Sequence, residues 1–259
     1  MNRGAGQFIL IAVLPRFFAP DAGRSAAGSI VVLPEDESAH VTRVLRLAVG
    51  DSVRIFDGDG REWRAEIAEV TRHRVGVMLF EALTPARESR IPIVLAVAVL
   101  KGDKMDEVVR DAAMLGATAI QPLITDRTEF SLSAVTRGHR TGRWQRLAVA
   151  SCKQCGRAVV PRVRAAQELD AWMAQPAQGA RLLLVEPATP ADVREIHDVQ
   201  APSAAEVVVG PEGGWTTREI DGAQAAGVEF VRLGTLTLRA DAVPLVALAA
   251  LRTIWRDWS

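Results

Sequence analysis

The sequence predicts an α/β protein in two parts, a small β-rich barrel followed by a parallel α/β sheet. Three observations support this prediction. The first third of the chain consists of short apolar or alternating runs that are separated by glycine and aspartate turns. From Ile93 onward, continuous apolar runs alternate with stretches of helical spacing, which is typical of a parallel sheet. Between the two parts, residues 84–92 are polar and contain two prolines, which suits a linker.

In the first part, strands are expected at residues 31–33, 52–56, 62–70 and 74–80. Turn sequences such as Asp57-Gly58-Asp59-Gly60 separate these runs. Residues 36–47 have helical spacing, with apolar side chains recurring on one side. We therefore expect a small barrel with one inserted helix.

In the second part, four of the six apolar runs are followed by a helical pattern. Gly116 and Gly227 stand where two of the helices should stop, and Pro244 is tolerated in the first turn of the last helix. Strands are expected at residues 93–100, 119–124, 159–163, 181–185, 206–209 and 229–233, and helices at residues 103–115, 143–152, 217–226 and 241–255.

The composition is that of an ordinary globular protein. Of the 259 residues 49% are hydrophobic, which is enough to build a core, and the formal net charge is zero. No overall field therefore points to nucleic acid or to an anionic membrane. Two cysteines make no disulfide framework and fit a reducing compartment. The apolar run Phe8–Leu14 is too short to span a bilayer and makes a weak signal peptide, so we expect a first strand or a ragged start there.

The sharpest local feature is the segment Val207-Val208-Val209-Gly210-Pro211-Glu212-Gly213-Gly214-Trp215, in which an apolar strand enters a glycine-rich turn. Glycines there allow a close approach of the backbone to a ligand. The segment is neither a Walker A loop nor a G-x-G-x-x-G fingerprint. Glu212 would repel a phosphate, which favours an uncharged or cationic group. An ordinary tight strand–helix turn explains the same residues equally well.

A second loop, residues 233–242, follows the next strand and carries Arg239 and Asp241 just before an apolar helix. Loops at the carboxyl ends of successive strands are where α/β sheets place ligands. Alternatively, Asp241 is a helix N-cap and Arg239 a surface residue.

The chain concentrates its basic residues between Arg137 and Arg164, with no acid among them. This segment, the basic stretch, predicts an anion-binding face, and Trp144 could stack on a base. A solvated helix face is the alternative.

Cys152 and Cys155 form a C-x-x-C pair inside the same stretch. A zinc site needs about four ligands, and no histidine stands at ligand spacing with another. A redox pair usually opens a helix, where the thiol pKa falls, whereas this pair ends a helical pattern at Gly156. Neither sulfur function is favoured.

Taken together, the motifs resemble the bacterial RsmE-type methyltransferases of the SPOUT class, which methylate N3 of a uridine in small-subunit ribosomal RNA. The resemblance covers nearly the whole chain from about Leu14. It rests on Arg16-Phe17-Phe18, His40 with Val44-Leu45-Arg46, Lys101-Gly102-Asp103-Lys104-Met105-Asp106, Leu115-Gly116, Pro122-Leu123, Asp126-Arg127, Gln154 with Gly156-Arg157, Val160-Pro161, Gly210-Pro211-Glu212-Gly213-Gly214, Glu219, Leu233-Gly234 and Leu238-Arg239.

The resemblance implies a PUA-like RNA-binding barrel over residues 1–85, in which residues 1–13 are an extension or follow a misplaced start codon. It implies a trefoil-knotted SPOUT methyltransferase domain with a parallel sheet over residues 91–259. The expected protein is a cytoplasmic homodimer that uses S-adenosylmethionine and no metal, binds no membrane, and acts on 16S ribosomal RNA of the small ribosomal subunit.

By position, the resemblance also assigns site residues. Arg239 would stabilise negative charge on the uracil and Asp241 would take the N3 proton. The cofactor would contact Leu184, Glu186, Gly210, Glu212, Gly213, Leu233, Gly234 and Leu238. RNA would contact Arg43, Arg46, Arg127, Arg143, Lys153 and Arg157.

The chain departs from the family at the catalytic loop, where Ala240, Ala242 and Pro244 replace the usual residues and Asp241 is one methylene shorter. Lys153 replaces an acid. Two rival hypotheses therefore remain: the same fold methylating another RNA site, and a catalytically impaired RNA-binding or assembly module. We expect Cys155→Ser to retain activity and Arg157→Ala to weaken RNA binding or turnover.

Overall fold

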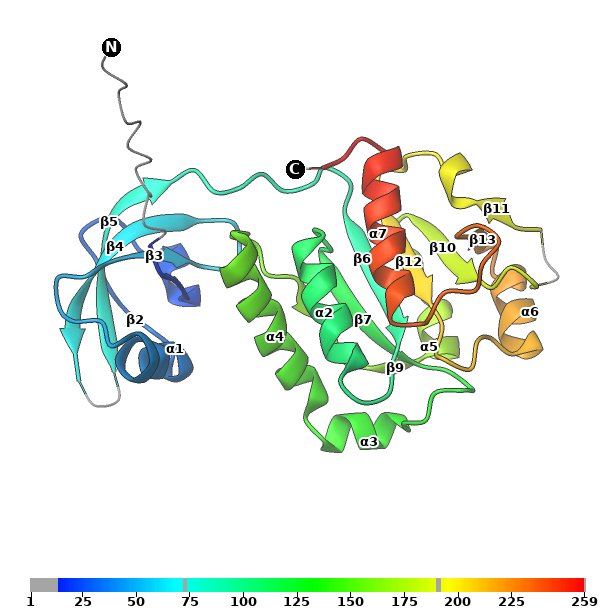
Figure 1. Cartoon of the computed structure of the whole chain (residues 1–259), viewed down its shortest axis with the longest axis horizontal. Helices are drawn as coiled ribbons and strands as arrows, with labels where there is room; N and C mark the ends of the chain where they lie inside the picture. The colour runs from blue at the N-terminus through cyan, green and yellow to red at the C-terminus, as the bar shows by residue number, and fades with distance from the viewer. Residues whose placement is uncertain (1–13, 72–73, 190–191, 259) are drawn as a thin grey trace, which may run out of the picture. The chain divides into compact units, whose positions relative to one another are not determined.

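The computed structural model describes residues 14–71, 74–189 and 192–258. The prediction for Phe8–Leu14 and the proposed extension over residues 1–13 lie outside these residues, except at Leu14. The chain divides into two compact units, Met1–Pro85 and Ala86–Ser259, and Figure 1 shows both.

The first unit is built on one curled sheet with strand order β1-β3-β4-β5-β2. The strands are β1 (Arg16–Phe18), β2 (Ile30–Val32), β3 (Ser52–Phe56), β4 (Glu62–Val70) and β5 (Val75–Leu83). β1 pairs with β3 in parallel, and the other pairs are antiparallel. The alternating side chains send Val53 and Ile55, among others, into a core that also holds Phe17 and Trp63. A short 3₁₀ turn, η1 (Pro20–Arg24), follows β1.

The predicted single helix over residues 36–47 forms as two pieces. α1 (Glu35–Ala39) passes directly into the π-helical turn η2 (His40–Leu45). Arg46 then takes a left-handed conformation with φ 55°, which ends the helix because such a residue cannot continue it. The turn brings partly buried Leu47 against the barrel core.

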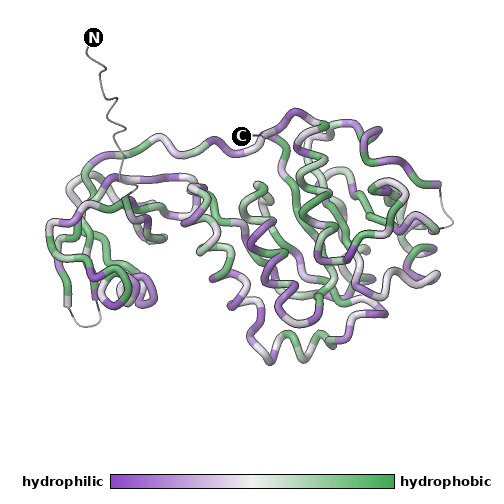
Figure 2. The backbone as a smooth tube through the Cα atoms, in the orientation of Figure 1, coloured by the Kyte–Doolittle hydropathy of each residue, from purple (hydrophilic) through white to green (hydrophobic). Residues whose placement is uncertain are grey.

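The second unit holds a largely parallel sheet with strand order β11-β13-β10-β12-β6-β7-β8, and β9 also pairs with β7. Every pairing that joins these strands is parallel. The strands are β6 (Ile93–Ala98), β7 (Ala119–Ile124), β8 (Arg162–Val163), β9 (Gln167–Glu168), β10 (Ala180–Val185), β11 (Arg194–Glu195), β12 (Ala205–Val209) and β13 (Glu229–Arg232). Strands β6 and β12 are buried at every position, and in Figure 2 the centre of this unit is correspondingly hydrophobic.

Helices cover both faces of this sheet. α2 (Lys104–Met114) packs between α4 (Arg140–Cys155) and α7 (Ala242–Ile254), side by side as in Figure 1. On the other face, α5 (Leu169–Met173) and α6 (Thr217–Ala225) share a core with Ala96, Leu183 and Val208. α3 (Leu132–Arg137) precedes α4, and the 3₁₀ turn η3 (Ile196–Asp198) follows β11. Because strand side chains alternate, Leu184 and Val209 point to the face opposite that core.

Several predicted bounds shift, and two of these elements lie in or beside the basic stretch. The helix expected at residues 143–152 runs from Arg140 to Cys155, and the strand expected at 159–163 shrinks to Arg162–Val163. Residues 158–161 form no ladder with β7, since pairing begins at Arg162 with Ala119. Pro161 lacks a backbone N–H and cannot donate to a ladder.

Candidate functional site

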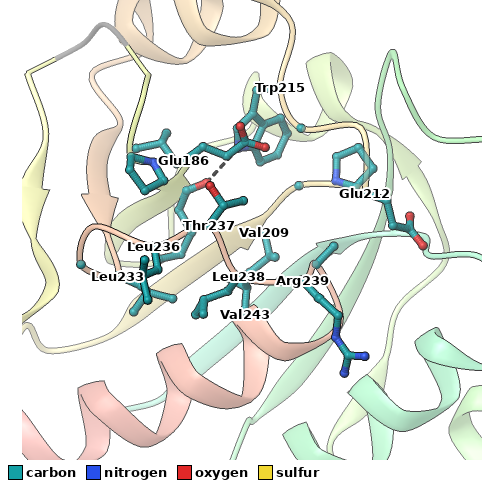
Figure 3. A pocket seen from close by; sticks show the side chains of 18 of the residues that line it. Glu186, Val209, Glu212, Trp215, Leu233, Leu236, Thr237, Leu238, Arg239 and Val243 are labelled. Atoms are coloured by element: carbon teal, nitrogen blue, oxygen red, sulfur yellow. Dashed lines mark hydrogen bonds between the residues drawn. The ribbon is translucent and has the colours of Figure 1, made fainter.

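A pocket of about 290 Å³ opens at the carboxyl ends of β10, β12 and β13. Its lining residues fall within the segments 184–187, 209–215 and 233–240, with Lys104 from α2 and Val243 from α7. Figure 3 shows Glu186 and Trp215 at one end of the pocket and Arg239 at the other, with its guanidinium directed away from Glu186. The carboxyl edge of a parallel sheet is the usual ligand position in this class of fold.

The glycine-rich loop after β12 is shaped by two close contacts. A Cβ at Gly210 would lie 2.9 Å from Cε2 of Trp215, and a Cβ at Gly214 would lie 2.7 Å from Oε1 of Glu186. Gly214 also has φ 68°, a conformation that favours glycine. Trp215 is fixed in turn because its Nε1 donates to the Leu184 carbonyl at 2.8 Å. A side chain at Gly210 would therefore displace the Trp215 ring, and one at Gly214 would be strained and would displace the Glu186 carboxylate.

Glu212 joins this loop to the segment after β6. Its Oε1 accepts from the Lys101 backbone N–H and from Lys104 Nζ, both at 3.2 Å. Burial raises the pKa of Glu212, but hydrogen bonds from backbone N–H groups and from Lys104 outweigh burial, and the net pKa lies below its ordinary value. The rim of the pocket thus carries a carboxylate that is ionised at neutral pH, with the Lys104 side chain beside it.

The start of α6 fixes the far end of the same loop. Thr216 and Glu219 form a capping box, and Glu219 Oε1 also accepts from the Asp126 backbone N–H at 2.9 Å. Arg218 pairs with Asp126 and Asp170 at 2.7 and 2.6 Å. Hydrogen bonds from Arg218 and Thr216 lower the pKa of Asp126. The loops that follow β7 and β12 are therefore held together by charge-assisted hydrogen bonds.

The loop after β13 brings Arg239 and Asp241 together. Arg239 Nη2 lies 3.2 Å from Asp241 Oδ2, and the exposed fractions of the two side chains are 81% and 10%. Asp241 stands at the N-cap position of α7 but makes no side-chain capping hydrogen bond. Among the described residues, its buried Oδ1 has no hydrogen-bond partner. Asp241 is therefore the N-cap residue of α7 by position but does not cap it through its side chain, and its carboxylate lies beside Arg239.

The pocket collects most of the residues that were assigned by position. It is lined by Leu184, Glu186, Gly210, Glu212, Leu233, Gly234, Leu238 and Arg239. Gly213 and Asp241 are not among the lining residues; the Gly213 carbonyl instead accepts from Arg127 Nη1 at 2.7 Å.

The sequence reasoning missed Lys104 and Trp215, which also line the pocket. Trp215 directly follows the glycine-rich loop already singled out. Lys104 follows β6, and its place at the pocket depends on the pairing of β6 with β12.

The prediction that the basic stretch forms an RNA-binding face needs correction. Trp144 is 2% exposed and cannot stack on a base. Arg157, expected to contact RNA, is 7% exposed. Its Nε and Nη2 donate to the Glu88 carboxylate, at 3.1 Å and 2.6 Å, and its Nη1 donates to the Ala113 and Ala117 carbonyls. Burial removes Arg157 from the surface on which RNA would dock, and its hydrogen bonds give it a structural role.

The remaining RNA candidates lie at or near the surface. Arg143 is half exposed but pairs with Asp106, and its Nη2 lies 3.5 Å from Asp103. Arg43, Arg46 and Arg127 are exposed, and Lys153 is half-buried. Acids from other segments thus offset part of the charge of the basic stretch.

The two cysteines lie in the last turn of α4, which ends at Gly156 with φ 91°. Cys152 is buried and Cys155 exposed. A hydrogen bond with Cys155, followed by burial, raises the pKa of the Cys152 thiol, so it is not an activated thiolate. In the described part of the chain, no group of three or more His, Cys, Asp or Glu side chains could hold a metal ion.

Comparison with known proteins gives consistent matches. Residues 87–252 match the model of the RNA methyltransferase domain, and residues 33–77 match the RNA methyltransferase PUA domain. A Synechocystis protein, ribosomal RNA small subunit methyltransferase E, is 34% identical over 86% of this chain and 73% of its own length. The Bacillus subtilis protein of the same name is 25% identical over 83% of this chain and 87% of its own length.

A solved structure of ribosomal RNA small subunit methyltransferase E from Neisseria gonorrhoeae, bound to S-adenosyl methionine, superposes with TM-score 0.83. It is 31% identical, and the match covers 93% of this chain and 98% of that one. A Legionella pneumophila structure with bound S-adenosylmethionine has TM-score 0.85 and 30% identity over 93% of this chain and 97% of its own. No helix among the described residues is long and apolar enough to cross a membrane.

These matches confirm the predicted fold class, a PUA-like barrel followed by a parallel α/β methyltransferase domain. They extend over both units and agree with the motifs that the sequence analysis singled out. The chain belongs to the ribosomal RNA small subunit methyltransferase E family.

Proposed function

We propose that this protein transfers a methyl group from S-adenosylmethionine to N3 of a uridine in 16S ribosomal RNA of the small ribosomal subunit. The observation that carries the proposal is the pocket at the carboxyl ends of β10, β12 and β13. It is built from the three loops that were assigned to the cofactor, in a family of which a solved member holds this cofactor.

The pocket residues fit the chemistry of that cofactor. Leu184, Val209 and Leu238 supply apolar surface for a purine ring. The carboxylates of Glu186 and Glu212 suit a cationic sulfur or ammonium group, and Lys104 suits a carboxylate. When bound, the cofactor supplies an electrophilic methyl group on a positively charged sulfur.

The residues of this chain would then prepare the uracil. N3 carries a weakly acidic proton, so it becomes a good nucleophile only when the proton leaves and the negative charge on the ring is stabilised. Arg239, at the pocket rim, stabilises that charge on the uracil carbonyl oxygens. Asp241 accepts the proton, and N3 gains the methyl group in its place. Its Oδ1 has no hydrogen-bond partner among the described residues, and Arg239 Nη2 lies 3.2 Å from its Oδ2.

Three further features belong to the same proposal. The chain acts as a cytoplasmic homodimer, its second unit is threaded as a trefoil knot, and it needs no metal and no membrane. RNA is contacted by the exposed side chains of Arg43, Arg46 and Arg127, and by Arg143 and Lys153 on α4. The motifs quoted in the sequence analysis support these features by resemblance.

Nucleoside mass spectrometry of small-subunit ribosomal RNA tests the proposal. Cells that lack the protein should lose a 3-methyluridine, and expression of the wild-type chain should restore it. Loss of a different methylated nucleoside would show that the protein methylates another RNA site and not uracil N3. An unchanged set of modified nucleosides would leave the RNA-binding or assembly module as the better hypothesis.

A further inference from the structure

The pairing of arginines inside the basic stretch changes where RNA can bind. Arg143 and Arg157 are paired with acids of other segments, Asp106 and Glu88. Arg162 and Arg164 close the same stretch, and no ion pair is recorded for either among the described residues. Part of the charge that the sequence places in this stretch is therefore available at its carboxyl end, around β8.

These two arginines line a second hollow of about 700 Å³. Its other walls are the residues at the amino ends of β6, β7 and β12, among them Pro92, Thr118 and Ala204. No acidic residue of the described chain is among its lining residues. Glu206 follows one of them directly, but it is 2% exposed and its Oε2 accepts from Arg181 Nε at 2.7 Å. The hollow is therefore cationic.

The two arginines are spaced along the backbone for a ligand with repeated charges. Residues two apart on a strand share a face and lie about 7 Å apart. Arg162 is exposed, and only Val163 between them turns into the core. Arg164 Nη2 donates to Gln178 Oε1 at 3.4 Å, which leaves other guanidinium donors available, since each guanidinium carries five N–H groups.

We propose that this hollow is a second RNA-contact site, which holds the sugar-phosphate backbone of the substrate at the amino edge of the sheet. Arginine suits phosphate oxygens by its planar fork of donors, and an acid-free hollow concentrates that attraction. The proposal rests on the proposed function in one respect, that the ligand is RNA. Because β6 is six residues long, the site lies about 20 Å from the cofactor pocket and contributes affinity without touching the reacting atoms.

The test is a salt titration of RNA binding by the full chain. In the Arg162→Gln/Arg164→Gln variant, affinity for small-subunit ribosomal RNA should fall about tenfold, and the slope of log K against log salt should fall by about 1.4, the value for two phosphate contacts of single-stranded RNA. In methyl transfer, KM for RNA should rise by the same factor, while kcat and calorimetric affinity for S-adenosylmethionine stay within twofold. Arg162→Lys/Arg164→Lys should regain most of the salt slope, because charge is retained.

Arg137→Gln/Arg146→Gln is the matched control, since it removes two exposed arginines of the same stretch that lie outside the hollow. It should leave the affinity within about twofold. An equal loss in this control, or an unchanged salt slope in the Arg162/Arg164 variant, would overturn the proposal. If circular dichroism shows that the double variant is unfolded, the single variant Arg162→Gln, which changes an exposed side chain, serves as the test. The slope of log K against log salt should then fall by about 0.7.

The RNA-binding measurement does not depend on catalysis. If wild-type protein binds ribosomal RNA but transfers no methyl group, the proposed function is contradicted. The RNA-contact site at the hollow is then still tested by the salt dependence of RNA binding in the Arg162/Arg164 variant. Wild-type protein that binds no RNA overturns both.

Discussion

At the scale of single residues, the pair Arg239 and Asp241 carries the proposed chemistry. Arg239 is exposed at the pocket rim, whereas Asp241 is nearly buried beside it. A nearly buried carboxylate beside an exposed guanidinium orients the cation by a charge-assisted contact. The replacements Ala240, Ala242 and Pro244 do not remove this pair.

Replacing Arg239 with alanine should lower kcat for methyl transfer about 100-fold, the usual cost of losing one group that stabilises developing charge. The affinity for S-adenosylmethionine, measured by calorimetry, should change little because the guanidinium points away from Glu186 and the glycine-rich loop. Turnover within a few-fold of wild type would remove Arg239 from the mechanism.

Arg157 shows how burial revises a residue-level prediction. Arg157→Ala should lower the free energy of unfolding by about 3 kcal/mol, because it breaks a largely buried ion pair with Glu88 and removes a donor from the Ala113 and Ala117 carbonyls. Cys155→Ser, two residues away and exposed, is the control and should change stability by less than about 0.5 kcal/mol. Chemical denaturation measures both. Equal stability of Arg157→Ala and wild type would restore Arg157 as a surface RNA contact.

Residue types in the loops were predictable, but their partners were not. Glycines and charged residues after two strands identified the segments around Gly210 and Arg239 as candidate loops. Nothing local in the sequence shows that Trp144 turns inward or that Glu88, 69 positions before Arg157, neutralises it. Such pairs depend on long-range packing.

At the scale of elements, the glycine-rich loop and α6 form one braced unit. Gly214→Ala should weaken S-adenosylmethionine binding at least tenfold, because its Cβ would meet Glu186 at 2.7 Å on a backbone with φ 68°. Gly222→Ala, inside α6 with open space at its Cβ, is the matched control and should stabilise the helix by up to about 1 kcal/mol. Calorimetry of both variants distinguishes a shaped loop from an ordinary turn, for which both affinities would match wild type.

The segment after α7 makes the stability of the second unit depend on pH. Asp257 accepts from the Arg90 and Ile91 backbone N–H groups at 2.8 and 2.9 Å and pairs with fully buried Arg252 at 2.6 Å. Burial raises the pKa of Asp257, but these backbone hydrogen bonds and Arg252 outweigh burial, and the net pKa is lowered.

A lowered carboxyl pKa stabilises the fold above the unfolded-state value, and this contribution is lost as pH falls through the folded-state value. The free energy of unfolding of wild type should therefore fall below about pH 4. Asp257→Asn should be less stable at neutral pH and should show a shallower decline in acid. Parallel pH profiles of the two proteins would contradict this role for Asp257.

Element bounds were predicted best where apolar runs are flanked by turns. The expected strands at residues 52–56, 62–70 and 119–124 coincide with β3, β4 and β7. The prediction failed at β8, where Pro161 interrupts an apolar run, and at residues 36–47, where Arg46 takes a left-handed conformation within a continuous helical pattern. Periodicity reports burial and is insensitive to such local backbone choices.

At the scale of the molecule, strand order determines which loops meet. β12 lies between β10 and β6, although β6 precedes it by more than a hundred residues. This order places Lys104, which follows β6, at the same pocket as the loops after β10, β12 and β13. Sequence patterns predicted the parallel sheet but not its order, because pairing between distant strands leaves no local signal.

The central claim is that this pocket carries methyl transfer to ribosomal RNA. Its most direct test is transfer of a labelled methyl group from S-adenosylmethionine to small-subunit ribosomal RNA by the purified chain, followed by nucleoside analysis. Wild type should label 3-methyluridine, and Gly214→Ala should label at least tenfold less at a cofactor concentration well below saturation. Absence of label with wild type, or equal labelling by the two proteins, would contradict the account.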